Sequence, residues 1–282
     1  MNQTLQSLTS FSFYLSIIAY FLSMLIYWLL LMTKKNILER FATAFAVIGL
    51  VANTITLITH AILAQRLPLS NGYEFILTFS WGIVLILLFS EFRFKLKTLG
   101  SFVMPVPFLL LLFAFMTMGP TGRIIQAIPP ALKSNWLTFH VITAILAYGA
   151  FAVSFGLGIM YLCKIYSGEN SNIVRLVTRF PDANFLDELA YKLIVFGFSF
   201  LTLVIITGAI WANYAWGTYW SWDPKETWSL ITWIIYAGYL HARLMYDWKG
   251  KRAAWLAVLG FASVLFTFFG VNYLLPGLHS YA

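Results

Sequence analysis

Long apolar runs dominate the chain, and short polar or basic segments separate them. A helix that crosses a membrane needs about 20 largely apolar residues, and eight runs reach or approach this length. The pattern therefore predicts an all-α fold, a polytopic membrane bundle of eight transmembrane helices. The expected spans are residues 11–32, 41–63, 74–90, 101–118, 136–162, 186–212, 227–246 and 253–275.

The basic residues are distributed unevenly over the connections between these spans. Of the 18 lysines and arginines, only Arg66, Arg123, Lys133 and Lys225 lie away from the connections after the first, third, fifth and seventh spans. Because basic loops stay on the cytoplasmic side of a membrane, both termini are expected on the outer, periplasmic or lumenal, side. This topology accounts for the formal net charge of +8 without a nucleic-acid partner.

The composition agrees with a single integral-membrane domain over residues 1–282. Hydrophobic residues make up 61% of the chain and charged residues 10%, whereas a soluble domain has about 25% charged residues. The N-terminus lacks the basic region and the small-residue cleavage site of a signal peptide, so the first apolar run is expected to remain as a span.

The longest polar connection, residues 163–186, is expected on the inner side. Its segment 172–180 places apolar residues on one side and two arginines on another, which is typical of a short amphipathic helix on the inner leaflet. Pro181 is expected to end this helix, and Asp182 or Asn184 to cap the next one. We interpret the connection as a structural anchor.

Few residues offer chemistry, and several classes of function are excluded. The lone Cys163 allows no internal disulfide, no CxxC redox pair and no CxxCH site for covalent haem. No glycine-rich phosphate loop is present. The carboxylates Glu74, Asp223 and Glu226 are expected at the outer surface, and a proton or ion relay would need them within the spans. No catalytic acid or base is expected.

The outer motif 214–233 contains the most unusual part of the sequence. Five of the 11 tryptophans surround the short charged segment Asp223-Pro224-Lys225-Glu226. Gly217 and Pro224 are expected to interrupt the helical pattern here. An aromatic shelf of this kind suits a large planar apolar ligand, and an ordinary interfacial tryptophan belt is the alternative. The tryptophans are Trp216, Trp220, Trp222, Trp228 and Trp233.

The four histidines are the candidate ligands. His140 and His279 are both expected at the outer surface, where two neutral imidazoles can bind a haem iron or another metal ion. His241 lies thirteen residues beyond Trp228, roughly 20 Å deeper along a helix. Each of the three has a plain structural alternative, namely an interfacial or carbonyl-bonded histidine. His60 is interpreted as structural.

Residues 216–244, WGTYWSWDPKETWSLITWIIYAGYLHARL, resemble the tryptophan-rich WWD signature of haem-handling proteins of cytochrome c maturation, a superfamily that includes CcmC, CcmF and CcsA, also called ResC. The Asp-Pro-Lys-Glu-Thr-Trp continuation is similar to CcsA in particular. Shorter similarities to CcsA occur at residues 68–74, 186–191 and 269–275. The first two spans carry little of the resemblance.

The resemblance implies a role for each candidate residue. His140 and His279 would be axial ligands of a haem at the outer face, gripped by Trp216, Trp220, Trp222, Asp223 and Trp228. His241 would meet haem b in transit, together with a histidine of a CcsB/ResB-like membrane partner. Lys225 and Glu226 are candidates for contacts to haem propionates or to the apocytochrome.

The function implied by the resemblance is haem transport and presentation of haem for covalent attachment to apocytochrome c. The chain would be a subunit of a holocytochrome c synthase, or haem lyase, complex in a bacterial cytoplasmic membrane or a plastid thylakoid membrane. A thioredoxin-like thiol reductant is a further implied partner. Two alternatives remain open at this point, a HemX-like haem-binding chaperone or regulator and a b-type electron-transfer protein.

Overall fold

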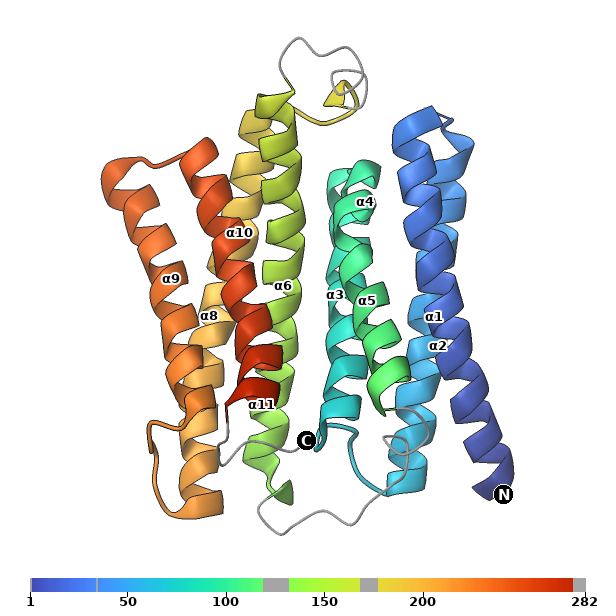
Figure 1. The fold of residues 1–282 in the computed structure, drawn as a ribbon, viewed down its shortest axis with the longest axis vertical. Coiled ribbons are helices and arrows are strands. Elements are labelled where there is room, and N and C mark those ends of the chain that lie inside the picture. The colour runs from blue at the N-terminus through green and yellow to red at the C-terminus, as the bar shows by residue number, and fades with distance from the viewer. Residues whose placement is uncertain (1, 34, 119–131, 168–176, 276–282) are drawn as a thin grey trace. The chain divides into compact units, whose positions relative to one another are not determined.

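The computed structural model describes residues 2–33, 35–118, 132–167 and 177–275, and all its regular elements are helical (Figure 1). The prediction of an all-α protein is confirmed for these residues. The chain divides into two compact units, Met1–Ala127 with Asn170–Phe180, and Ile128–Glu169 with Pro181–Ala282. The expectation of a single domain over the whole chain stays a prediction.

The first unit is built from three long helices and a broken fourth one. The elements are α1 (Asn2–Thr33), α2 (Ile37–Ala64), α3 (Gly72–Phe94), η1 (Lys97–Leu99), α4 (Gly100–Val103), α5 (Pro105–Phe113) and the π-helical η2 (Ala114–Met118). The second unit contains α6 (Asn135–Tyr166), α8 (Ala183–Trp216), α9 (Pro224–Tyr246), α10 (Lys251–Leu265), the π-helical η5 (Phe266–Gly270) and α11 (Val271–Leu274).

Seven helical stretches among the described residues are long and apolar enough to cross a membrane. They are Gln3–Thr33, Ile37–Ala64, Gly72–Phe94, Lys97–Thr117, Asn135–Tyr166, Ala183–Trp216 and Lys251–Gly270. The protein is therefore a multi-pass membrane protein. Five of the expected spans lie within these stretches, and the spans expected at 101–118 and 253–275 overlap them but extend slightly further. The span expected at 227–246 lies in α9, which is 23 residues long but less apolar. The count of eight stays a prediction.

Buried hydroxyl groups join the first two helices of the first unit. The Thr9 hydroxyl donates to the Thr59 hydroxyl at 2.8 Å, and the Ser12 and Thr56 hydroxyls lie 2.8 Å apart. Small polar residues allow membrane helices to approach closely and provide interhelical hydrogen bonds where hydrophobic burial alone gives little preference for association. This seam explains why two strongly apolar helices pack in one fixed register.

The first unit also contains a buried ion-pair cluster that the sequence did not predict. Glu74, expected at the surface, is only 1% exposed, because its carboxylate accepts from both guanidinium nitrogens of Arg66 at 2.8 Å and from the Ser70 N–H at 2.7 Å. The Nε2 atom of His60 lies 3.0 Å from the same carboxylate. The interpretation of His60 as structural agrees with this arrangement.

A second buried carboxylate lies near the opposite end of α3. Glu91 is 1% exposed and accepts hydrogen bonds from the hydroxyls of Tyr27 and Thr43 and from the Lys97 ammonium. The partners come from α1, α2 and η1, so one carboxylate joins four elements of the unit. The ionisable groups that the first unit buries here are thus paired within the unit.

A stack of two aromatic rings crosses the middle of the second unit. Phe151 of α6 and Tyr236 of α9 are stacked with ring centroids 3.7 Å apart and an angle of 7° between the planes. Gly197 of α8 lies against the Phe151 ring, and Gly260 of α10 lies against the Tyr236 ring. A methyl group at either glycine would lie within 2.7 Å of ring atoms. The two glycines therefore allow four helices to close around the stack.

The connection expected at 163–186 is shorter in the structure. α6 continues to Tyr166 and α8 begins at Ala183, with Asp182 at the N-cap but without a side-chain cap hydrogen bond. Most of the expected amphipathic helix 172–180 lies outside the described residues. In the described part, Phe180 is buried and Arg179 donates to the Leu30 carbonyl at 2.7 Å.

The helices α6, α8, α9 and α10 run alternately in opposite directions (Figure 1). The α6–α8 and α9–α10 connections therefore lie at one end of the second unit, and the α8–α9 connection at the other. The first of these ends carries Lys249, Lys251 and Arg252, and we call it the basic end. The other end carries the tryptophans.

Candidate functional site

The segment between α8 and α9 is shaped by a glycine and a capping box. α8 ends at Trp216, and Gly217 follows with φ +78°, its N–H donating to the Asn213 carbonyl at 2.9 Å. Asp223 then caps α9 by accepting from the Lys225 N–H at 2.9 Å, while the Glu226 carboxylate accepts from the Asp223 N–H at 3.2 Å. The expected interruption at Gly217 and Pro224 is confirmed.

The charged side chains of this segment serve the fold itself. Glu226 also accepts from the Ser221 N–H at 2.8 Å, and the Lys225 ammonium donates to the Asn272 side-chain oxygen of α11 at 3.0 Å. Burial lowers the pKa of Lys225 to about 8, although the nearby Asp223 acts in the opposite direction. In the structure these side chains contact other residues of the chain, and the expected contacts of Lys225 and Glu226 with a ligand or a client stay predictions.

The tryptophans before α9 form two edge-to-face pairs. Trp216 lies against Trp211, one turn earlier in α8, with centroids 4.9 Å apart, and Trp220 lies against Trp222 with centroids 5.7 Å apart. The Trp222 side chain is 68% exposed, and its backbone has φ +61°, a conformation that few large residues adopt. This strained turn leaves a large aromatic surface open.

The tryptophans of α9 face the neighbouring helices. The Trp228 ring lies on Phe266 of η5, with centroids 4.1 Å apart. The Trp233 N–H donates to the Thr202 hydroxyl of α8 at 2.9 Å. Because π-helical turns within longer helices often mark functional sites, the contact of Trp228 with η5 favours this end of the unit as the site.

His140 is held against the backbone of α8. Its Nδ1 atom lies 2.9 Å from the Val204 carbonyl oxygen, and its ring is nearly parallel to that of Trp211, with centroids 6.1 Å apart and 23° between the planes. A methyl group at Gly208 would lie 2.9 Å from two atoms of the imidazole. The absence of a side chain at Gly208 therefore allows the ring to lie on the helix.

This geometry determines which nitrogen carries the proton in the neutral imidazole. A carbonyl oxygen can only accept, so the hydrogen bond requires the proton on Nδ1, and the neutral ring then carries its lone pair on Nε2. Metal-ligating histidines commonly donate their other N–H to a carbonyl in this way, which fixes the ring and raises its basicity. The chemistry of His140 thus fits an axial ligand of a haem iron, and the adjacent tryptophans fit a porphyrin.

His241 lies near the other end of α9, and its side chain is exposed. Its ring lies edge-on to Tyr246, with centroids 5.8 Å apart. Helical spacing places Ile234, Gly238 and Met245 on the same face as His241. All three are exposed as well, and a methyl group at Gly238 would meet no atom within 4 Å. The face of α9 that carries His241 is therefore open to a ligand or to a second protein.

The structure brings together only part of the predicted site. His140 and Trp216 are linked through Trp211, whereas Trp228 faces Phe266 of η5 and Asp223 caps α9. His279 lies outside the described residues. Trp211 and Gly208 were missed in the sequence, although their spacing with Val204 marks one face of α8.

Comparison with known proteins assigns the family. Residues 69–279 match the family model described as cytochrome C assembly protein. The chain belongs to this family, and its relatives place it among the CcsA proteins. It is 39% identical to the cytochrome c biogenesis protein CcsA of Guillardia theta, with 96% of each chain covered. It is 35% identical to that of Gloeobacter violaceus, with 91% of this chain and 90% of the relative covered.

Solved structures with a similar fold include a haem lyase. The cytochrome c heme lyase CcmF superposes with a TM-score of 0.68 at 18% sequence identity, over 93% of this chain. The chain spans 46% of the length of that protein. At this identity the similarity supports the helical architecture alone.

Proposed function

We propose that the protein carries haem to the outer face of the membrane and presents it there for covalent attachment to apocytochrome c. Membership of the cytochrome c assembly family supports a role in cytochrome c maturation and the involvement of haem. The observation that carries the proposal is the position of the His140 imidazole. Its Nδ1 atom is fixed by the Val204 carbonyl, and the Trp211 ring lies beside it.

The proposal includes an eight-span topology with both termini outside. α9, with 23 residues, has a helical length of about 34 Å, enough to cross a hydrocarbon core of about 30 Å. Its neighbours α8 and α10 run in the opposite direction (Figure 1). The basic end of the second unit then faces the cytoplasm, or the stroma of a plastid, and the tryptophan end faces outward. The membrane would be a bacterial cytoplasmic membrane or a plastid thylakoid membrane.

Three histidines would hold haem b at two stages. His241 would meet haem on the exposed face of α9, opposite a ligand from a CcsB/ResB-like partner. His140 and His279 would hold the iron at the outer face, where Trp216, Trp220, Trp222 and Trp228 would contact the porphyrin. Asp223 contributes to this site mainly as the cap that shapes the segment.

The chain would act by orientation, as a subunit of a haem lyase complex. Each cysteine thiol of an apocytochrome CxxCH site adds across a haem vinyl group, so that a C–S bond forms, the thiol proton passes to the other vinyl carbon and no net oxidation occurs. The fixed ring of His140 would keep the haem edge in one position for this addition. A thioredoxin-like reductant would supply the cysteines as thiols.

The test is co-purification with a CcsB-like partner, followed by absorption spectra of the wild type and of the His140→Gly, His241→Gly and His279→Gly variants. We expect a haem Soret band that weakens or shifts in each variant. A band that is unchanged in all three would refute the ligand assignment. Deletion of the gene should remove c-type cytochromes from the membrane; if they persist, a haem-binding chaperone or regulator is the better description.

A further inference from the structure

The end of α9 that carries His241 is tied to α8 by a buried ion pair. The Arg243 guanidinium forms a bidentate ion pair with the Asp187 carboxylate. Nη1 lies 3.0 Å from Oδ1, and Nη2 lies 2.8 Å from Oδ2. The two side chains are 8% and 10% exposed. A two-pronged, charge-assisted contact of this kind fixes orientation as well as distance.

The same carboxylate also holds the turn after α9. The Gly250 N–H donates to Asp187 Oδ1 at 3.0 Å. Gly250 has φ +70°, and a methyl group there would lie 2.5 Å from the Tyr161 hydroxyl, so the close approach requires glycine. The Tyr191 ring, one turn beyond Asp187, lies 4.5 Å from the guanidinium carbon of Arg243. Asp187 thus joins α8, α9 and the α9–α10 turn.

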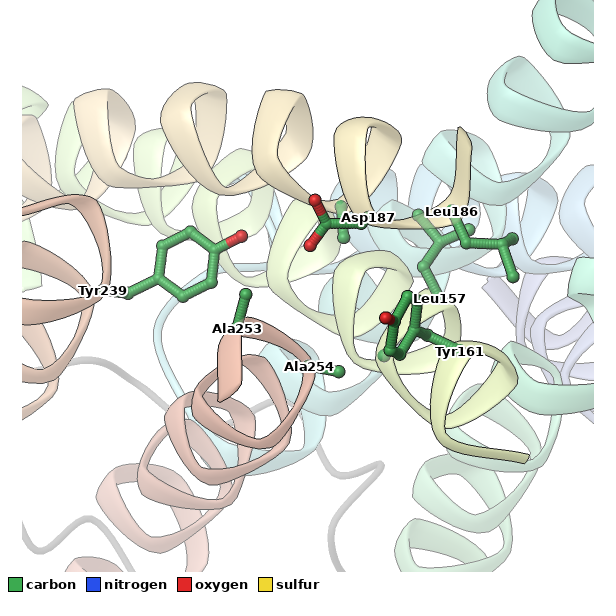
Figure 2. A pocket seen from close by; sticks show the side chains of 9 residues that line it. Leu157, Tyr161, Leu186, Asp187, Tyr239, Ala253 and Ala254 are labelled. Atoms are coloured by element: carbon green, nitrogen blue, oxygen red, sulfur yellow. The ribbon is translucent and has the colours of Figure 1, made fainter. Parts of the chain in front are cut away.

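Figure 2 shows the small pocket beside this ion pair. Asp187 of α8 and the hydroxyl of Tyr239 of α9 point toward each other across it, and Ala253 and Ala254 of α10 lie below. The small side chains of α10 leave room for the polar groups between the helices. The arrangement places the charged contact inside the helix packing and away from the lipid-facing surface.

The last turn of α9 contributes little apolar packing. Leu244, Met245 and Tyr246 are 66%, 70% and 69% exposed, so beyond the buried Tyr239 and Ala242 this end of α9 depends on the ion pair. Arg243 follows His241 by two residues, which is about 200° around a helix. Holding the arginine against α8 therefore turns the histidine away from α8, onto the open face.

We propose that Asp187 and Arg243 are positioning residues for His241, because their ion pair sets the rotation of α9 and so directs the imidazole toward its ligand. This proposal rests on the proposed function for the role of His241 as a haem ligand. The rotational anchoring itself can be measured without haem. In this role the two side chains pair with each other and act on the ligand only through His241.

The anchoring is tested with a nitroxide label on Met245→Cys in a Cys163→Ser background of the full chain. Asp187→Asn and Arg243→Met should make the label severalfold more mobile. The label on Leu259→Cys of α10 should not respond. Glu188→Gln is the matched control, because it breaks the exposed pair with Lys192 on the same helix. Unchanged mobility at position 245 would overturn the proposal, whether or not haem binds.

The second test uses the haem spectrum of the full chain with its partner. Asp187→Asn and Arg243→Met should weaken the His241-dependent part of the spectrum about tenfold, the scale of loss when the support of a metal ligand is removed. Arg243→Lys, which keeps only the charge, should fall between. In a His241→Gly background Asp187→Asn should cause no further loss, and a further loss there would contradict a role that acts through His241. An unaltered spectrum in His241→Gly alone would refute the role of that residue as a haem ligand. The mobility of the nitroxide label at position 245 would still test whether the ion pair fixes the rotation of α9.

Discussion

His60 in the first unit and His140 in the second are the same residue type in opposite surroundings. His60 is 2% exposed, and its Nε2 atom meets a carboxylate that also binds Arg66. His140 is half-buried, and its Nδ1 atom meets a neutral backbone carbonyl beside an aromatic ring. In this chain, nearly complete burial and an ion-paired partner mark His60 as a structural group. The half-buried His140, oriented by a carbonyl, has the surroundings of a candidate ligand.

The largest expected effect separates these two histidines directly. His140→Gly should abolish assembly of c-type cytochromes, and added imidazole should restore part of it by occupying the vacated space. His60→Asn should retain assembly in proportion to the folded protein and should not respond to imidazole. Haem staining of membrane cytochromes measures both. Full assembly by His140→Gly, or imidazole rescue of His60→Asn, would reverse the distinction.

Gly208 offers a way to disturb His140 without replacing it. In Gly208→Ala the added methyl would lie 2.9 Å from the ring, so the imidazole must shift and we expect its hydrogen bond to the Val204 carbonyl to be lost. We expect haem bound at the outer site to fall about tenfold, because the ligand loses the hydrogen bond that orients it. Ile206→Ala, on the exposed side of the same helix, is the control for protein level. Equal haem signals in both variants would show that the orientation of His140 is unimportant.

The cluster around His60 should affect stability and leave ligand chemistry unchanged. Glu74→Gln leaves the Arg66 charge without its carboxylate, and breaking a buried ion pair in this way typically costs about 3 kcal/mol. We expect earlier thermal unfolding of the detergent-solubilised protein, with an unchanged haem spectrum per folded molecule. A changed spectrum at constant folded fraction would bring the first unit into the haem site.

Much of the fold could be predicted from the sequence, because apolar run length and turn residues are local signals. The ends of α8 and α9 at Gly217 and Pro224 were predictable for this reason. The capping box of Asp223 and Glu226 is an equally local signal, although the resemblance assigns Asp223 to haem and Glu226 to haem or the apocytochrome.

The parts that could not be predicted depend on contacts between distant helices. Trp211 becomes a candidate site residue only because α6 places His140 beside it. The sequence pattern of α8 does not reveal this neighbour. Glu74 looked like a surface residue at a helix start, because its partners His60 and Arg66 belong to the preceding helix and loop. Pairing of side chains across helices, and with it burial, is therefore what a single sequence leaves open.

The smallest expected effect concerns Lys225. Its ammonium is hydrogen-bonded to a neutral side chain, whereas the Glu74 carboxylate is paired with a charged arginine. Lys225 precedes the expected span, and its ammonium is held by the neutral side chain of Asn272. Burial lowers its pKa from 10.5 to about 8, so between these values the folded protein binds fewer protons than the unfolded chain. Stability should therefore rise as the pH increases from about 8 toward 10.5.

Lys225→Gln removes this titration, while its amide can still donate to Asn272. The melting temperature of the wild type, followed by tryptophan fluorescence, should increase relative to that of Lys225→Gln over this pH range. Lys192→Gln, at an exposed ion pair with Glu188, is the control and should follow the wild type. If the wild type and Lys225→Gln keep a constant difference across the range, the ammonium is not desolvated. The Lys225 ammonium at the tryptophan end of the second unit would then be stabilised as well as the ion-paired groups around His60.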